Sequence, residues 1–311
     1  MAEGANMARE IREQATILAR NVPKYRRAAC DQLAGLKPRG VLLIARGSSD
    51  NASLLARYLI ETHLRIPVSL AAPSVLTRYG AEVDYRGFLG VGVSQSGAGP
   101  DVAEMLSLVR SQGGATLAIT NVADSPVARS AEAVILLEAG HEESVAATKT
   151  YTASLAALYE AIRALGAGLP EPRTPDDGWI EDCRSQAKAA LPTLLQGQVL
   201  ISVGRGYRYA TACETALKLI ECALLPCKSY STADFVHGPL ALAGAGSCVV
   251  TFGEPVTGTD STVVEAPDVG DAPDSPLLDV VFGQWLAHFA ALARGLDPDA
   301  PPRLTKVTRT Y

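Results

Sequence analysis

The sequence lacks the features that mark several classes of protein. No run of lysine or arginine forms a basic stripe, charged residues amount to 20%, and the formal net charge is -5. Since a nucleic-acid binder needs a basic face, no anionic polymer is expected as a partner. No apolar stretch approaches the roughly 20 residues of a bilayer-spanning helix, and the N-terminus has no basic-then-apolar signal pattern. We therefore expect a cytoplasmic protein that binds neither nucleic acid nor membranes.

Cysteine and histidine are too few and too scattered to suggest a metal centre. The six cysteines include no C-x-x-C pair, and no two of the four histidines have the helical spacing used by metalloenzymes. The cysteines are expected to be reduced and structural. Neither a metal nor another cofactor is expected.

The sequence does contain strand-length apolar runs that alternate with amphipathic segments. A first helix is expected from Met7 to about Asn21, with Pro23 near its end. Apolar residues recur at helical spacing within residues 52–59, 102–109 and 155–162. Four short apolar runs lie among turn-forming residues and are expected to be strands, namely Val41–Ala45, Phe88–Val93, Ala115–Thr120 and Ala133–Leu137. This alternation predicts a parallel, doubly wound sheet.

A stretch rich in proline and glycine, residues 166–178, is expected to be a linker. Beyond it the pattern restarts, because Val199–Gly206 followed by a helix to Glu221 echoes Val41–Gly47 followed by a helix to Glu61. We therefore expect two copies of one α/β fold, residues 1–168 and residues 169–311.

The second copy is expected to be the shorter one. Strands are expected at Ser247–Phe252 and Thr262–Glu265, but only about nine residues separate them, too few for a full crossover helix. A helix is expected at Leu277–Leu292, and the proline-containing tail from Asp297 is expected to be extended.

Two serine-bearing turns follow predicted strands. Ser94, Gln95 and Ser96 precede Gly97 and a helix that starts near Pro100, and earlier in the chain Gly47 precedes Ser48 and Ser49. Loop amides, hydroxyls and the positive end of a helix favour a phosphate dianion. Serines at such turns also serve simply as helix caps. If both turns bind ligand, they form one pocket at the crevice of an open sheet.

Glu221 and His237 form a second candidate pair. A glutamate and a histidine can divide acid and base work near neutral pH. Each also has an ordinary interpretation, Glu221 as a surface charge at a helix end and His237 as a hydrogen-bonding loop residue. Lys306, near the end of the chain, taken by itself is a solvated tail charge.

Together these motifs resemble the sugar isomerase (SIS) family, in particular the isomerase half of glucosamine-6-phosphate synthase and, more closely, the isomerase-fold type of glucosamine-6-phosphate deaminase. The resemblance covers nearly the whole chain, and it implies two tandem SIS-type domains, the second shortened. Its most specific stretches are Ala45–Asn51, Ser94–Gly97, Ser144–Lys149, His237–Leu242 and Leu304–Thr308.

The resemblance implies a role for each candidate residue. The hydroxyl turns, with Ser48, Ser49, Ser94, Gln95 and Ser96, would hold the 6-phosphate. Gly47 and Val145 would line the sugar site. In the chemical step, Glu221 would move the proton between C1 and C2, His237 would assist ring opening, and Lys306 would meet the open-chain carbonyl. The family commonly forms homodimers, so His237 is a candidate for the neighbouring subunit's site.

Some positions depart from the synthase. Arg46 replaces a cysteine, which favours the deaminase-like branch. Gly99 stands where a hydroxyl usually contacts phosphate, and Ala147 and Val236 replace a serine and a lysine. These changes bear on which sugar phosphate is bound.

The expected reaction is deamination with isomerisation, from glucosamine 6-phosphate to fructose 6-phosphate and ammonia. Synthesis from glutamine would need an amidotransferase domain with an N-terminal cysteine, and no such domain is expected within these 311 residues. The alternatives are an aldose-ketose isomerase, a deglycase of another sugar phosphate, or a non-catalytic sugar-phosphate sensor. The roughly 40 residues before the first strand are too few for a complete DNA-binding domain, so a sensor would act through a protein partner.

Overall fold

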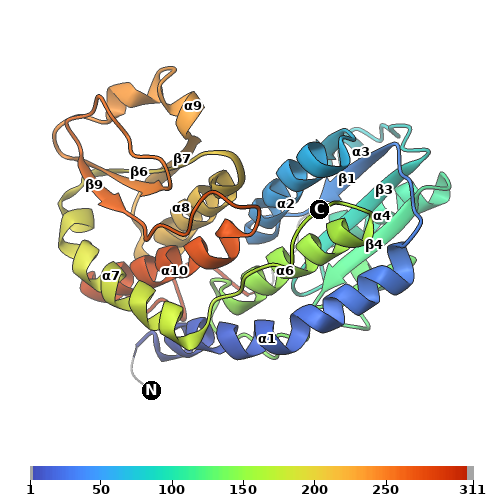
Figure 1. The fold of residues 1–311 in the computed structure, drawn as a ribbon, viewed down its shortest axis with the longest axis horizontal. Coiled ribbons are helices and arrows are strands. Elements are labelled where there is room, and N and C mark those ends of the chain that lie inside the picture. Colours follow the sequence, from blue (N-terminus) through green and yellow to red (C-terminus); the bar gives the residue numbers. More distant parts are fainter. Residues whose placement is uncertain (1–2, 307–311) are drawn as a thin grey trace. The chain divides into compact units, whose positions relative to one another are not determined.

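The computed structural model describes residues 3–306, so Val307 and Thr308 of the tail motif lie outside the described residues. The chain divides into two compact units (Figure 1). The unit that we call the first-sheet unit contains residues 17–140 and 150–172. The second-sheet unit contains residues 3–16, 141–149 and 173–306.

The first-sheet unit is built on five parallel strands in the order β2-β1-β3-β4-β5. Its strands are β1 (Gly40–Ile44), β2 (Val68–Leu70), β3 (Phe88–Ser94), β4 (Ala115–Thr120) and β5 (Ala133–Leu136). Its helices are α2 (Ser48–Leu59), η1 (Ile60–Leu64), α3 (Ser74–Thr77), α4 (Pro100–Ser111), α5 (Pro126–Arg129) and most of α6 (Lys149–Ala164). The strands and helices expected here are confirmed. The three-residue strand β2 was not expected, because so short a segment carries little pattern.

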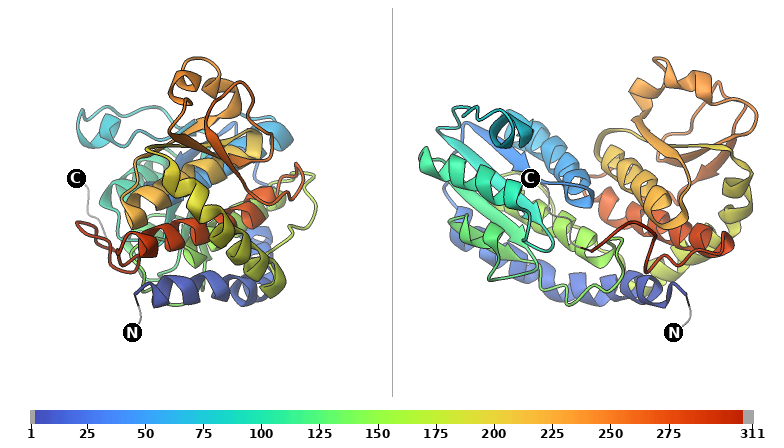
Figure 2. Two further views of the ribbon diagram at one scale, coloured as in Figure 1. Left: turned by 90° about the vertical axis from the view of Figure 1, so that its left-hand side faces the viewer. Right: turned by 180° about the vertical axis from the view of Figure 1, so that it is seen from behind.

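The core of this unit explains why its strands are apolar. All five residues of β1 are buried, and Leu42 and Ile44 pack with Val102, Leu106 and Val109 of α4. A parallel sheet is covered by helices on both faces, so its strands are continuous apolar runs. Figure 2 shows helices on both sides of this sheet.

The second-sheet unit is built on four parallel strands in the order β7-β6-β8-β9. Its strands are β6 (Val199–Gly204), β7 (Cys227–Ser231), β8 (Ser247–Phe252) and β9 (Thr262–Glu265). Its helices are α7 (Asp177–Gln196), η2 (Gly206–Arg208), α8 (Tyr209–Ala223), α9 (Thr232–Phe235), η3 (Pro239–Leu242) and α10 (Ser275–Ala293). The expected strands β8 and β9 are confirmed, and residues 253–261 between them contain no helix.

The two sheets share a topology. With β6 in the place of β1, the order of the second sheet matches that of the first four strands of the first sheet. The core of this unit lies between its sheet and helices α7, α8 and α10, with Leu219, Val250 and Trp285 among its buried residues. Helices α8 and α10 lie side by side in Figures 1 and 2.

Helix α10 corrects one expectation. It spans 19 residues, and an 18-residue window has a mean hydropathy of 1.3, so it is long and apolar enough to cross a bilayer. However, 83% of that window is buried within the structure. A helix that is apolar all round is typical of a core as well as of a membrane span, and α10 is buried in this core.

Helix α1 (Ala5–Leu33) is longer than its pattern predicted, and Pro23 lies inside it rather than near its end. Proline removes one backbone hydrogen bond and usually kinks or ends a helix. Beyond Pro23, however, Tyr25, Ala29 and Leu33 are buried, and the Tyr25 hydroxyl donates to the Leu137 carbonyl. Packing of this apolar face maintains the helix past the proline.

The linker is also shorter than expected. Helix α7 starts at Asp177, where the side chain of Asp176 accepts a hydrogen bond from the Trp179 amide at 2.7 Å. An aspartate in this position satisfies one of the free amides of a helix start, so the helix begins within the predicted linker.

Candidate active site

The five candidate phosphate-binding residues lie at one edge of the first sheet. Ser48 and Ser49 follow β1, Ser94 ends β3 and precedes Gln95 and Ser96, and these two parallel strands pair directly. With the order β2-β1-β3, the chain reverses its direction of progress across the sheet between β1 and β3. The carboxyl ends of strands at such a position form the usual ligand crevice of open α/β sheets.

The serine-bearing turn after β1 is tight, and Gly47 gives the start of α2 no side-chain cap. Gly47 has a φ of 56°, which glycine adopts without strain, and its carbonyl accepts the Asp50 amide at 3.0 Å. Gly47 and Gly99 precede α2 and α4 and have no side chain to cap them, and in the first turn of α4 the Val102 amide donates to Asp101 Oδ1 at 2.9 Å. The serines are therefore not used as helix caps, the alternative that the sequence left open.

The second turn is held rigidly by its own serines and by its neighbours. The Gly97 amide donates to Ser94 Oγ at 3.1 Å, and the Ala98 amide donates to Ser96 Oγ at 3.3 Å. Gly97 has a φ of 63°, and a Cβ there would lie 2.2 Å from Ser125 Oγ. Only glycine fits this position, so Ser94, Gln95 and Ser96 are presented in a fixed conformation while remaining half-buried.

An ion pair joins the segments that carry these turns. Arg46, directly after β1, donates from Nε to Asp101 Oδ2 at 2.8 Å. Asp101 is buried in the first turn of α4, whereas the Arg46 side chain is 53% exposed. Part of the Arg46 side chain is therefore open to solvent while its Nε is paired.

In the second-sheet unit, Glu221 belongs to a cluster of charges along α8. The ammonium of Lys218 forms ion pairs with Glu221 and, at 3.4 Å, with Glu214. Lys218 and Glu214 are almost completely buried, whereas the Glu221 side chain is 23% exposed. The Glu221 carboxylate is thus partly exposed to solvent and is held by its ion pair with the buried Lys218.

Electrostatics accounts for a fully buried lysine in this cluster. Burial disfavours the charged ammonium, but the carboxylates of Glu214 and Glu221 outweigh it and raise the pKa of Lys218 above its ordinary value. A buried cation with two carboxylate partners restricts the rotamers of Glu221. A proton carrier needs such fixed geometry.

His237 lies apart from this cluster within the same unit. It is exposed in the turn between α9 and η3, and its backbone amide donates to the Asp234 carbonyl at 3.0 Å. Within residues 3–306, no hydrogen bond or ion pair connects His237 with Glu221. The exposed apolar side chains Val236 and Leu242 are 56% and 53% exposed, so this segment presents both an imidazole and apolar surface.

Val145 and Lys306 are brought together. Lys306 Nζ donates to the Ser144 carbonyl at 2.7 Å and to Glu142 Oε2 at 2.6 Å, and Glu142 is fully buried. The other oxygen of Glu142 accepts the Thr148 amide at 2.9 Å. Lys306 is therefore held by the same loop that carries Val145 and is not a freely solvated tail charge.

The sequence reasoning missed Lys218 and Glu142. For Lys218 a signal existed, because Glu214, Lys218 and Glu221 have the spacing of one helix face. For Glu142 there was none, because its partner Lys306 is distant in the sequence and only the fold brings the two together.

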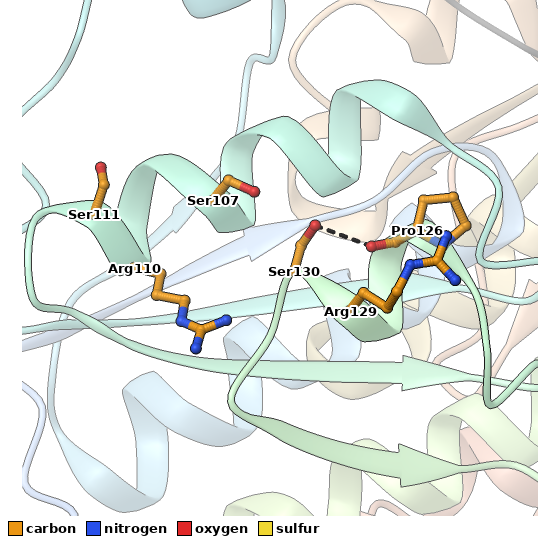
Figure 3. A pocket seen from close by; sticks show the side chains of 6 residues that line it. All are labelled: Ser107, Arg110, Ser111, Pro126, Arg129 and Ser130. Carbon is orange, nitrogen blue, oxygen red and sulfur yellow. Dashed lines mark hydrogen bonds between the residues drawn. The ribbon is translucent and has the colours of Figure 1, made fainter.

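A groove lies elsewhere on the first-sheet unit, between α4 and α5 (Figure 3). It has a volume of about 570 Å³ and is lined by Ser107, Arg110, Ser111, Pro126, Arg129 and Ser130. The Arg129 guanidinium pairs with Asp124, and the Ser130 hydroxyl donates to the Pro126 carbonyl at 2.9 Å. None of the predicted site residues lines this groove.

Comparison with known proteins finds a family match for most of the first-sheet unit. Residues 36–164 match the family model described as the SIS domain. Two glutamine–fructose-6-phosphate aminotransferases (isomerizing) are similar to this chain. That of Methanothermobacter thermautotrophicus is 34% identical over 304 residues, covering 86% of this chain and 51% of the relative. That of Pyrobaculum aerophilum is 32% identical over 344 residues, covering 96% of this chain and 56% of the relative. The chain thus spans about half the length of these curated relatives.

Solved structures agree in fold. A Silicibacter pomeroyi structure, provisionally described as a phosphosugar isomerase, has a TM-score of 0.77 at 28% identity and covers 94% of this chain and 99% of that one. Glucosamine-6-phosphate deaminase from Thermotoga maritima has a TM-score of 0.79 at 22% identity, with 98% and 100% covered, and shows a shared fold. Residues 36–164 therefore match the SIS domain, and the chain is similar over most of its length to the relatives and solved structures named above.

Proposed function

We propose that this chain is a sugar-phosphate enzyme that deaminates and isomerises a hexosamine 6-phosphate, converting glucosamine 6-phosphate to fructose 6-phosphate and ammonia. The observation that carries the proposal is the anchored carboxylate of Glu221, ion-paired with the buried Lys218. The same chain contains a region that matches the SIS domain, in which two serine-bearing turns lie at the carboxyl ends of the paired strands β1 and β3. The aminotransferase names of the relatives support a fructose 6-phosphate skeleton.

In this proposal the serine turns bind the dianionic phosphate and Glu221 transfers a proton. The open-chain aldose has an aldehyde at C1 and an amine at C2. Glu221 takes the C2 proton, the electrons of that C–H bond form the C1–C2 double bond, and the carbonyl π electrons move to O1, which takes a proton from solvent to give the enaminol. Glu221 then returns its proton to C1, the nitrogen releases one N–H proton to solvent, and an imine remains at C2. Addition of water at C2 breaks the C–N bond and releases ammonia and the ketose. The proton ends on C1, so the base is regenerated.

His237 and Lys306 have supporting roles in the proposal. His237 would move a proton between the ring oxygen and O1 during ring opening, in its own chain or in that of a dimer partner. Lys306 would place an ammonium beside the open-chain carbonyl, and its contact with the Val145 loop supports that position. Gly47 and Val145 would line the sugar.

The direction of the reaction follows from the resemblance at Ala45–Asn51. Arg46 favours the deaminase-like branch, in which ammonia is released rather than added. An aldose-ketose isomerase or a deglycase would use the same proton transfer on a different substrate. A sensor would bind the phosphate without turnover.

The test is an assay of ammonia and ketose 6-phosphate release from a panel of hexosamine phosphates. Glu221→Gln keeps the shape and removes the base, so we expect kcat to fall by about 10² to 10⁴ while ligand binding persists. Exchange of the C2 hydrogen with deuterated solvent should fall in parallel. Glu181→Gln, an exposed carboxylate of α7, is the matched control and should change neither rate.

Each alternative gives a different result in that assay. Ketose formation without ammonia from a non-amino sugar phosphate would indicate an isomerase. Ammonia release confined to an N-linked conjugate would indicate a deglycase. Binding without turnover or C2 exchange on any member of the panel would contradict the proposal and favour a sensor.

We also infer that the second-sheet unit is a shortened SIS-type domain, so that the chain contains two tandem copies divided near residue 168. The shared strand order supports this inference, whereas the SIS family match covers only residues 36–164. The proposed setting is a cytoplasmic homodimer that acts on a small molecule.

A further inference from the structure

The C-terminal tail of the described chain is fastened to the start of α1. The Asp299 carboxylate accepts the Met7 amide at 2.7 Å and the Asn6 amide at 2.9 Å. Asp297 Oδ1 accepts the amide of Gly4 at 3.0 Å and that of Asp299, also at 3.0 Å. Carboxylates at a helix start satisfy its free amides and interact favourably with the helix dipole. The tail thus supplies the cap that the start of α1 needs.

The same tail residues hold the loop that contains Val145. The Asp299 carbonyl accepts the Val145 amide at 3.1 Å, and Ser144 Oγ donates to the Pro298 carbonyl at 3.3 Å. From the other side, the buried Glu10 of α1 accepts the backbone amides of Glu143 and Ser144. Asp299 is therefore the point where α1, the Val145 loop and the tail meet.

Without this fastening, little regular structure would hold Lys306. Residues 297–306 form no helix or strand, so their backbone has no ladder of hydrogen bonds to fix it. Beyond Asp299, Lys306 is held by Glu142 and the Ser144 carbonyl. An irregular segment keeps its conformation only when its contacts offset the entropy of ordering it.

We infer that Asp299 is a positioning residue, which holds the tail against the start of α1 and thereby places Lys306 beside Val145. The inference rests on the proposed function only in assigning a catalytic consequence to the position of Lys306. Loss of the Asp299 contacts would leave the phosphate-binding turns of the first-sheet unit intact. It would lower the fraction of molecules in which Lys306 is in place, and turnover scales with that fraction.

The test compares Asp299→Ala with a matched control, Asp176→Ala. Asp176 caps α7 in the same unit through the Trp179 amide, so the control removes a helix cap without touching the tail. Mass spectrometry would follow reductive methylation of lysines in folded protein. Asp299→Ala should speed labelling of Lys306 several-fold and leave Lys149, which is 4% exposed, unchanged. The control should alter neither rate.

Kinetics provides the second measurement. We expect Asp299→Ala to lower kcat about tenfold with less than a twofold change in KM, whereas Asp176→Ala keeps both. Asp299→Asn retains an acceptor oxygen, so its kcat should lie between those of the wild type and Asp299→Ala. The asparagine variant replaces the alanine variant in the test if the latter fails to fold.

Unchanged Lys306 labelling in a folded Asp299 variant would overturn the inference. So would loss of kcat equally large in the Asp176→Ala control. The labelling needs no substrate, so it tests the position of Lys306 even if the wild-type protein proves inactive on glucosamine 6-phosphate.

Discussion

Arg46 and Asp101 form an ion pair that links the segment after β1 to the first turn of α4, the helix that follows β3 and its serine turn. The carboxylate is buried and the guanidinium is about half exposed. Without Arg46, a buried negative charge would remain close to the proposed phosphate site. The pair therefore affects both the stability of this edge and its affinity for an anion.

We expect Arg46→Ala to weaken binding of the sugar phosphate about tenfold or more and to lower the free energy of unfolding by roughly 1–3 kcal/mol, because a buried charge loses its hydrogen-bonded partner. Calorimetric titration and urea unfolding measure the two effects. Arg86→Ala breaks the exposed pair with Asp84 in the same unit and is the control. Equal, small effects of both variants would show that the Arg46 pair is only a surface contact.

Ser96→Ala should weaken the phosphate ligand about tenfold while the protein stays folded, since a hydrogen bond to a charged group contributes roughly 1.5–3 kcal/mol. Ser107→Ala, whose hydroxyl donates to the Ala103 carbonyl at 2.9 Å, is the matched control on α4. Titration with fructose 6-phosphate measures both. Full affinity in Ser96→Ala would place the phosphate elsewhere.

Mixing inactive Glu221→Gln protein with inactive His237→Ala protein tests whether the two residues act from different chains. In a symmetric dimer with shared sites, half of the randomly exchanged dimers are mixed and each has one intact site, so about a quarter of the wild-type activity should return. The exposed position of His237 motivates the test, since no hydrogen bond or ion pair within residues 3–306 connects it with Glu221. No recovery after verified subunit exchange would mean that both residues serve one chain.

His288 should make stability depend on pH. Burial lowers its pKa to about 4, so the folded protein disfavours the imidazolium. A lowered histidine pKa means that the unfolded chain binds the proton first, and stability is lost as pH falls from about 6.5 through 4. The loss should reach roughly 3 kcal/mol at most, at about 1.4 kcal/mol per pKa unit.

Urea unfolding between pH 7 and pH 4, in wild type and in His288→Phe, measures this contribution. The variant keeps an aromatic ring beside Trp285 and cannot titrate, so its unfolding free energy should fall less over the same range. Parallel pH curves for the two proteins would show that His288 is not responsible.

The sequence by itself determined most strands, though not β2 or β7, together with most helices and the two serine turns. Continuous apolar runs such as Ala115–Thr120 can be stable only when buried on both faces, so pattern and structure agree there. Gly97 was recognisable from the sequence as a turn residue, because glycine is the residue that most readily adopts positive φ angles. The structure agrees, since Gly97 has a φ of 63°.

Tertiary structure alone decided what depends on contacts between distant residues. Pro23 remains inside α1 because the residues beyond it pack, and Glu142 meets Lys306 because the fold brings the tail to its loop. Asp299 caps a helix at the opposite end of the chain, which no local pattern encodes. Local propensity acts over a few neighbouring residues, whereas ion pairs and caps of this kind depend on where the whole chain has packed.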